Sequence, residues 1–434
     1  MSDPVFQYRY TIDDSVSDHA RGIDTGWERL SDSGFRDRPE HARMLTAPLV
    51  DDQMWAQDLW RVARAVYLAD RRSPRDRTAD NWTRTIVMSI QVFQPDRWGP
   101  HCTLLNDLLQ VLTGDRWDVR VHGGVGSQGQ LPVQPEYTHV ALFSGGLDST
   151  AYAAQRAGQL DTSERALFVA YDATVGRCQR RVFEDIKRLA PPETVRMEPT
   201  RLSPHGGALD HSNRSRGFLY IATAVCLAAI NGAQNVMVPE NGQLACNPAL
   251  TPGRRSACST RSVHPWTLYA INQLITRLGG GVTVDNPLLH KTKGQVCALA
   301  LDAGLSWSTL EQTVSCGHPT SPKRPSYHCG HCFPCLVRRS GLHAVRGDRR
   351  DDTIYETGLQ EIELTDLRTG DSGPAADLRD LIRWLDTDFT VDDLIADAPF
   401  PPGTPHTLMP VLHHGRHELR TMLVDLLPDA YPPR

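Results

Sequence analysis

The residues with the clearest chemical meaning form the sequence SGGLDS, which runs from Ser144 to Ser149. They follow an apolar run at 140–143 and precede a helix-like run at 151–155. Glycine lets a backbone approach phosphate closely, and the free N–H groups at the start of a helix point toward an anion. We therefore predict a phosphate cradle between a strand and a helix. It is not a Walker A loop, because no Gly-Lys-Ser/Thr sequence closes it. An ordinary surface turn is the alternative, which the agreement of strand, loop and helix signals disfavours.

A second constellation consists of four cysteines with the spacing C-x12-C-x2-C-x2-C, namely Cys316, Cys329, Cys332 and Cys335. Four thiolates close a tetrahedral zinc site with no open position, which is typical of a structural metal. Folding of the surrounding loop would then be coupled to metal binding. Four unrelated reduced cysteines and an iron–sulfur cluster are the alternatives. We interpret the nearby His318 and His331 as loop or supporting residues and not as ligands.

Composition narrows the class of protein. The chain has 434 residues and a net charge of -5, with 40% hydrophobic and 22% charged residues. Two or three domains are expected at this length, and the net charge argues against a broad nucleic-acid-binding surface. The other cysteines are scattered, so a disulfide scaffold is not indicated. The N-terminus lacks a signal-peptide core, and no apolar run reaches membrane-spanning length. We expect a soluble cytoplasmic protein.

The elements that must position these residues follow from hydrophobic periodicity. In residues 1–130, helical spacing at 55–69 and 104–112 and alternation at 86–92 and 117–121 predict a small α/β extension. Gly114 is expected to end the second helix. The glycine-rich stretch 123–130 reads as a flexible joint.

The central segment, 136–346, reads as an α/β domain. Strand-like runs lie at 140–143, 166–171, 194–197, 235–238 and 281–284, with helical patterns between them that include 217–230 and 265–278. This alternation predicts a parallel sheet with helices on both faces. Ligands of such sheets bind beyond the C-terminal strand ends, where Ser144 falls. The last segment, 351–434, is predicted to be helical around 378–385 and 419–427.

Three stretches together resemble a known family. SGGLDS matches the SGGxDS signature of the PP-loop ATP pyrophosphatases, which split ATP between its α- and β-phosphates. The stretch from Cys329 to Arg338, CGHCFPCLVR, and the stretch from Pro287 to Lys293, PLLHKTK, are similar to those of the 7-cyano-7-deazaguanine synthase family, QueC. The resemblance covers about residues 138 to 345. It implies a PP-loop (adenine nucleotide alpha hydrolase-like) sheet with a zinc knuckle.

The resemblance also implies an activity and a set of roles. In the family reaction a 7-deazaguanine carboxylate attacks the α-phosphate of ATP, and an amine then displaces AMP from the acyl-adenylate. The loop would hold the leaving pyrophosphate through Ser144, Gly145, Gly146, Leu147 and Ser149. Asp148 would bind Mg²⁺ or cap the following helix, roles that are not exclusive. Lys293 would hold a phosphate, with Thr292 capping its helix.

The resemblance also implies roles for residues outside these three stretches. Arg216 would contact phosphate or carboxylate, and Tyr171 would contact adenine through its backbone. The family asparagine after Arg216 is replaced here by Gly217, and the family loop for the deazaguanine base is replaced by the stretch at 239–244. Glu240 and Asn241 in that stretch would pair with a purine edge.

Several alternatives stay open for the amine that accepts the acyl group. The front and rear extensions resemble the QueC-like proteins of Qat anti-phage defence operons, which implies the N-terminal amine of a partner protein as acceptor. One alternative is a free-standing 7-cyano-7-deazaguanine (preQ0) synthase that uses ammonia. A second is a tRNA sulfurtransferase of the PP-loop class with Cys178 or Cys246 as its sulfur carrier, although a basic RNA-binding face is missing. A third is a non-catalytic nucleotide-binding scaffold.

Overall fold

The chain divides into two compact units, each built from separated segments. The computed structural model describes residues 4–11, 26–31, 34–36, 53–123, 136–171, 175–200, 203–204, 210–251, 261–317, 328–364, 373–429 and 431–432. Unit 1 comprises Met1–Val140, Thr200–Met237 and Cys258–Asp285, and unit 2 comprises Ala141–Pro199, Val238–Ala257 and Asn286–Arg434. The predicted joint lies, beyond its first residue Gly123, outside the described residues.

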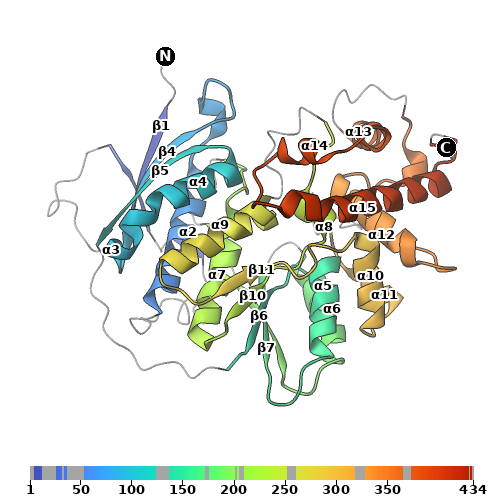
Figure 1. Ribbon diagram of the computed structural model, residues 1–434, viewed down its shortest axis with the longest axis horizontal. Helices are drawn as coiled ribbons and strands as arrows, with labels where there is room; N and C mark the ends of the chain where they lie inside the picture. Colours follow the sequence, from blue (N-terminus) through green and yellow to red (C-terminus); the bar gives the residue numbers. More distant parts are fainter. Residues whose placement is uncertain are drawn as a thin grey trace. The chain divides into compact units, whose positions relative to one another are not determined.

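Unit 1 contains a four-stranded parallel sheet of order β2-β1-β4-β5 (Figure 1). Its strands are β1 (Val5–Thr11), β2 (Glu28–Ser31), β4 (Thr85–Val92) and β5 (Arg116–Gly123). The helices predicted around it are α2 (Met54–Arg72) and α4 (Cys102–Thr113), with the short α3 (Pro95–Trp98) between them in the chain. Gly114 ends α4 in the left-handed conformation, with φ 74°, which glycine adopts without a steric cost. The predicted helices and strands of this segment are therefore present, whereas the domain limits 1–130, 136–346 and 351–434 stay predictions.

The remaining elements of unit 1 come from later in the chain. They are α7 (Arg216–Asn231), α9 (Pro265–Arg277), the parallel pair β10 (Asn235–Met237) and β11 (Thr283–Asp285), and the antiparallel pair β3 (Phe35–Arg36) and β9 (Ser203–Pro204). Helix α7 packs along α2, and the Gln53 amide donates to the Ala229 carbonyl at 3.0 Å. Helix α9 carries an apolar face that is buried over most of its length, as its helical spacing predicts.

A buried ionic network fixes the loop that precedes α7. The Arg84 guanidinium is fully buried and lies 2.5 Å from Asp70 and 2.6 Å from Asp115. Arg75 donates to both carboxylate oxygens of Asp115, at 2.7 and 2.8 Å. Asp70 also accepts the Ser215 hydroxyl at 2.6 Å. Each buried charge thus has an opposite charge and hydrogen-bond partners, which burial of a charge requires.

The front of unit 2 carries alternating strands and helices. They are β6 (His139–Leu142), α5 (Leu147–Ala157), β7 (Ala166–Tyr171), α6 (Gly176–Lys187) and β8 (Val195–Thr200). Strands β6, β7 and β8 are neighbours in that order. Phe143, Phe168 and Phe183 pack edge to face with centroids 5.6–6.1 Å apart, which joins these strands to α6. The structure is α/β, with parallel sheets flanked by helices, and the predicted fold class is confirmed.

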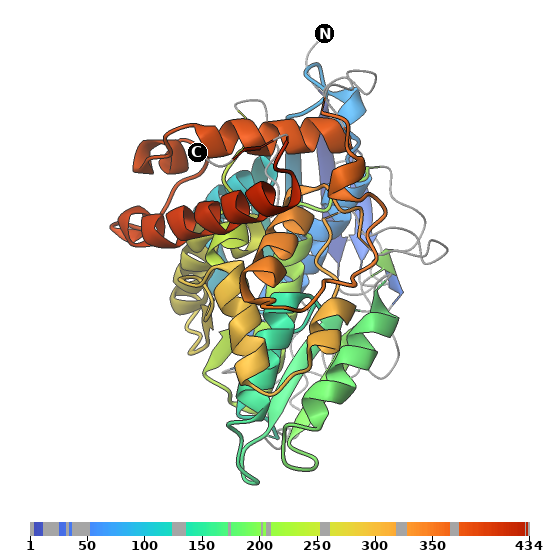
Figure 2. The ribbon, with the colours of Figure 1, turned by 90° about the vertical axis from the view of Figure 1, so that its right-hand side faces the viewer.

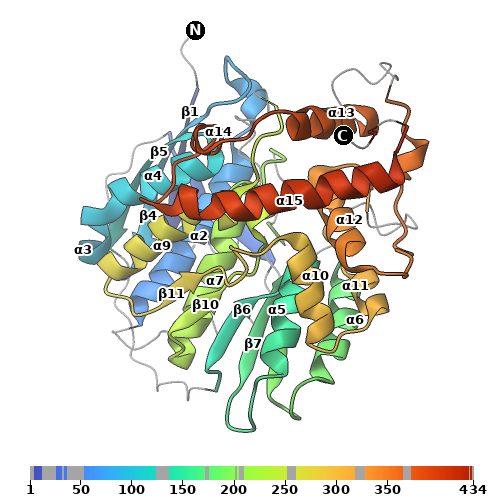
Figure 3. The same cartoon turned by 45° about the vertical axis from the view of Figure 1, so that its right-hand side comes forward.

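The rear of unit 2 is helical, as predicted for the C-terminal segment. It contains α8 (Gly242–Cys246), α10 (Lys293–Asp302), α11 (Trp307–Gln312), α12 (Phe333–Val345), α13 (Pro374–Asp386), α14 (Val391–Ile395) and α15 (Thr404–Leu426). Helix α15 runs alongside α12 and α10 (Figures 2 and 3). One apolar core joins Leu244 of α8 and Leu336 of α12 to Leu378, Leu385 and Leu419 of the C-terminal segment. That segment is therefore packed into unit 2. None of the helices in the described parts of the chain has the length and apolarity that a membrane crossing requires.

Candidate active site

The SGGLDS loop joins β6 to α5 at the end of the strand. Helix α5 begins at Leu147 with Gly146 as its N-cap residue, so the second half of the motif is the first turn of the helix. Gly145 has φ +75°, and a Cβ there would lie 2.5 Å from Cγ of Gln179. Glycine is required for both reasons, conformation and space. Ser144 is exposed, whereas the following residues of the loop are buried.

The polar groups of the loop form a compact network. The N–H groups of Gly146 and Leu147 donate to the hydroxyls of Ser144 and Ser315, each at 3.2 Å. The Ser144 and Ser149 hydroxyls are 3.1 Å apart. Gln179 donates to the Ser144 carbonyl at 2.8 Å. Successive N–H groups and hydroxyls at a helix start suit a phosphate, and an anionic oxygen is a stronger acceptor than the hydroxyls that now accept from them.

Directly behind the loop lies a buried cluster of charged and amide groups. The Lys293 ammonium, which is fully buried, forms an ion pair with one carboxylate oxygen of Asp148. The Asn241 amide donates to the other oxygen at 3.2 Å and to the Glu240 carboxyl at 3.0 Å. Burial raises the pKa of Glu240 well above its ordinary value, and the negative charge of Asp148 raises it further, whereas Lys293 lowers it. The structure thus brings four predicted site residues together: Asp148, Glu240, Asn241 and Lys293.

The start of α5 bears on one of the two roles predicted for Asp148. The N-cap role is wrong, because the helix begins at Leu147 and Gly146 occupies the cap position without a side-chain hydrogen bond. The Mg²⁺ role remains a prediction. Carboxylates of Asp148 and Glu240 are the hard oxygen ligands that Mg²⁺ takes, but Asp148 is already paired with Lys293, so it could serve the metal only if the lysine moved.

Several neighbours hold Lys293 at the start of α10. Thr292 is the N-cap residue, and it forms a capping box with Gln295, so the predicted capping role is confirmed. The Lys293 N–H donates to the side-chain carbonyl of Gln243 at 2.9 Å. Gly341 of α12 lies directly against the lysine, since a Cβ there would be 2.3 Å from Lys293 Cγ.

The four predicted metal-binding cysteines converge in unit 2. The thiol sulfurs of Cys316, Cys329, Cys332 and Cys335 all lie within 4.8 Å of one another. The Cys316–Cys332 and Cys329–Cys335 sulfur pairs are each 3.9 Å apart. A tetrahedral zinc ion with Zn–S bonds of about 2.3 Å requires edges of roughly 3.8 Å. The donor set and its spacing therefore fit zinc.

His331, which lies between Cys329 and Cys332 in the chain, is engaged by a carboxylate. His331 Nδ1 lies 2.7 Å from the Asp377 carboxylate of α13, and the hydrogen bond to Asp377 raises the pKa of His331 to about 10. Because its Nδ1 is engaged by Asp377, the interpretation of His331 as a supporting residue fits the geometry. His318 lies outside the described residues. Gly330 adopts φ +90°, and a Cβ there would lie 2.3 Å from the Thr357 carbonyl.

The metal centre is connected to the glycine loop through the chain before Cys316. Val314 donates its N–H to the Gly145 carbonyl at 3.1 Å, and Ser315 accepts from Leu147. The Ser315 N–H lies 3.4 Å from Nε2 of His328, the residue before Cys329. A closed metal centre would therefore fix the two residues that line one side of the loop.

Arg216 and Tyr171 are the remaining predicted site residues. Arg216 is exposed in unit 1 at the start of α7, with its guanidinium 5.8 Å from the Tyr220 ring. Tyr171 is the last residue of β7 and is buried. Sequence reasoning missed Gln179, Gln243 and Ser315, which hold the loop and Lys293. Polar residues of this kind carry no motif, and only their position beside a recognised motif residue could have drawn attention to them.

Comparisons with known proteins bear on the same residues. Residues 264–346, which include Lys293 and the four cysteines, match the family described as Queuosine biosynthesis protein QueC. A 7-cyano-7-deazaguanine synthase of Acinetobacter baylyi is 25% identical over 242 residues, which are 50% of this chain and 94% of that protein. The enzyme of the same name from Syntrophotalea carbinolica is 27% identical over 226 residues, 47% of this chain and 90% of that protein.

Other relatives match over a shorter stretch. The 7-cyano-7-deazaguanine synthase of Rhodopirellula baltica is 25% identical over 132 residues, which are 30% of this chain and 48% of that protein. The chain thus spans about half the length of this relative and nearly all of the two above. The family match and the relatives both support a relationship between this chain and the 7-cyano-7-deazaguanine synthases of the QueC family.

Proposed function

We propose that this protein is an ATP-dependent ligase that adenylates a 7-deazaguanine carboxylate, such as 7-carboxy-7-deazaguanine, and then forms an amide in the cytoplasm. The observation that carries the proposal is the convergence of the SGGLDS loop with Lys293, which comes from the separate PLLHKTK stretch. Both are similar to QueC-family stretches, and they meet through the buried ion pair with Asp148. The names of the relatives indicate a 7-deazaguanine as the class of substrate.

In the proposed reaction the chain contributes positioning and charge. The N–H groups of Gly146 and Leu147, with the hydroxyls of Ser144 and Ser149, hold the leaving pyrophosphate. Lys293 turns from Asp148 to a phosphate oxygen. Mg²⁺, when bound, would neutralise further phosphate charge. The substrate carboxylate attacks the α-phosphate, pyrophosphate leaves, and an amine then displaces AMP from the acyl group.

We assign the remaining predicted residues within the same scheme. Glu240 receives the exocyclic N–H groups of the purine edge, and Asn241 holds it through the 3.0 Å hydrogen bond. Arg216 contacts a phosphate or the substrate carboxylate, and Tyr171 contacts adenine through its backbone. The cysteines bind a structural zinc ion that keeps Val314 and Ser315 against the loop.

We further propose the N-terminal amine of a partner protein as acceptor, with a role in bacterial anti-phage defence. This part rests on the resemblance to the QueC-like proteins of Qat operons and on the added segments at both ends of the chain. The second candidate, a free-standing synthase that converts the carboxylate to a nitrile with ammonia, is favoured by the names of the relatives. The sulfurtransferase alternative is disfavoured at Cys246, because burial raises the pKa of its thiol to about 12 and a sulfur carrier needs an accessible thiolate.

One experiment separates these candidates. Purified protein is incubated with ATP, Mg²⁺ and 7-carboxy-7-deazaguanine. Separate reactions also contain ammonium, a peptide with a free N-terminus, or the same peptide with its N-terminus acetylated. Nucleotides and conjugates are measured by mass spectrometry. AMP formation that depends on the deazaguanine supports the ligase. A nitrile with ammonium identifies the free-standing synthase, and a deazaguanine amide on the free peptide alone identifies a protein acceptor. Absence of AMP under all conditions would overturn the proposal and favour the scaffold.

A further inference from the structure

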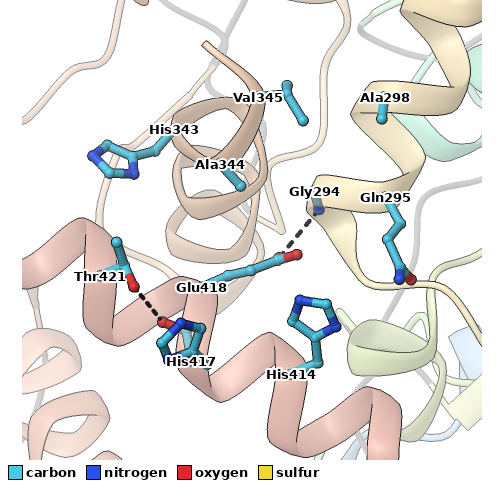
Figure 4. Close-up of a pocket in the computed structure, with 10 residues that line it drawn as sticks. All are labelled: Gly294, Gln295, Ala298, His343, Ala344, Val345, His414, His417, Glu418 and Thr421. Carbon is cyan, nitrogen blue, oxygen red and sulfur yellow. Dashed lines mark hydrogen bonds between the residues drawn. The ribbon is translucent and has the colours of Figure 1, made fainter. Parts of the chain in front are cut away.

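The C-terminal helix α15 reaches the first turn of α10, the helix that begins with Lys293. Glu418 of α15 accepts the Gly294 N–H at 3.1 Å with one carboxylate oxygen and the Thr292 hydroxyl with the other. Figure 4 shows the Glu418 side chain pointing from α15 to Gly294. The two partners flank Lys293 in the chain. A carboxylate at this place also complements the positive end of the α10 dipole.

A second contact from α15 supports the same residue. Gly415, one turn before Glu418, lies against Gln243, since a Cβ there would be 2.3 Å from the terminal amide of Gln243 and would force that amide to move. Gln243 in turn accepts the Lys293 N–H at 2.9 Å. Helix α15 thus holds Lys293 from both of its chain neighbours and, through Gln243, from its own N–H group.

We infer that Glu418 is a positioning residue for Lys293, and that the C-terminal segment is in this way an integral part of the candidate active site. Loss of the Glu418 carboxylate would free the N–H of Gly294 and the hydroxyl of Thr292 in the turn that sets the direction of the lysine. Small displacements of a charge that contacts the reacting phosphates lower the rate more than they lower binding. The expected effect on kinetics rests on the proposed function, whereas the expected effect on the conformation of residues 292–296 does not.

The surroundings of Glu418 make the substitution practicable. Glu418 lines a pocket of about 350 Å³ together with His414, His417, His343 and Thr421. Water in this pocket can occupy the space that a shortened side chain leaves. Thr421 supplies a matched control, since it lines the same pocket one turn later, and its hydroxyl donates only to the His417 carbonyl of its own helix.

The test compares E418A, E418Q and T421A by hydrogen exchange and by AMP formation. In E418A we expect amides of residues 292–296 to exchange at least tenfold faster and the kcat for AMP formation to fall about tenfold, with the KM for ATP changed less than threefold. E418Q retains an acceptor for Gly294 and can donate to the Thr292 oxygen, so we expect it to restore most of both properties. T421A should behave as the wild type.

The outcomes are distinguishable. The inference would be overturned if E418A had the same hydrogen exchange and the same rate of AMP formation as T421A. It would also be overturned if E418Q restored neither property relative to E418A. If E418A does not fold, G415A provides the second variant, and unchanged exchange in residues 292–296 of G415A would overturn the inference. If the wild type forms no AMP, the proposed function fails, while faster exchange in E418A with rescue in E418Q would still support the positioning contact.

Discussion

Replacement of Gly341 by alanine tests whether α12 fixes Lys293 by direct contact. Gly341 lies inside α12 with an ordinary helical backbone, so propensity alone would favour alanine by about 0.5–1 kcal/mol. The added Cβ would lie 2.3 Å from Lys293 Cγ and 2.9 Å from both its backbone carbonyl carbon and its Cβ. Two of these atoms belong to the rigid start of α10, so they cannot move aside as the end of a flexible side chain would.

The expected magnitude follows from these opposing effects. Overpacking of a well-packed site costs about 1–3 kcal/mol, which exceeds the gain in helix propensity. A net loss of about 1–2 kcal/mol should lower the melting temperature by about 2–8 °C for a unit of this size. We also expect the rate of AMP formation to fall, because α10 must shift and carry Lys293 with it.

The same substitution at Gly158 provides the control. Gly158 follows α5 with a right-handed backbone, and a Cβ there would meet the Ala154 and Gln155 carbonyl oxygens at ordinary distances of 3.7 and 3.9 Å. We expect G158A to leave the free energy of unfolding unchanged or to raise it by up to about 1 kcal/mol, so its melting temperature should stay the same or rise slightly. AMP formation should be unchanged. Differential scanning calorimetry of both variants decides the matter. If G341A melts at or above the wild-type temperature, as G158A does, our reasoning about the contact with Lys293 is refuted.

Three further predictions concern the loop, the ion pair and the metal centre. K293M should lower stability by about 3–5 kcal/mol, because it leaves the Asp148 carboxylate buried without its cation, and D148N/K293M should recover most of the loss in denaturant titrations; equal stability of the single and double variants would contradict this. G145A should reduce AMP formation at least tenfold, since φ +75° and the 2.5 Å approach to Gln179 exclude a side chain; wild-type activity of this variant would show that the loop conformation is not required. Metal analysis should find one zinc ion per chain, and C332S or treatment with a strong chelator should lower the melting temperature; iron in place of zinc, or an unchanged melting temperature without metal, would disprove the structural zinc centre.

Much of the fold was accessible from the sequence because its signals are local. The strand at Ala166–Tyr171 is continuous and buried, and the spacing at 265–278 matches α9 to within one residue. Helix α5 begins earlier than the sequence predicts, because the prediction takes the whole glycine turn as a loop before the helix. Gly146 instead caps α5, so Asp148 lies inside the helix and is free to turn toward Lys293.

Sequence by itself determined the phosphate loop and the four cysteines, since each motif lies within a short stretch and its residue types allow few other chemistries. Only the tertiary structure decided which distant groups complete the site. Asp148 and Lys293 are 145 residues apart in the chain, and Thr292 and Glu418 are 126 apart. Such pairs carry no periodicity or spacing signal, because their proximity results from the packing of α10 against α5 and α15 and not from local backbone preference.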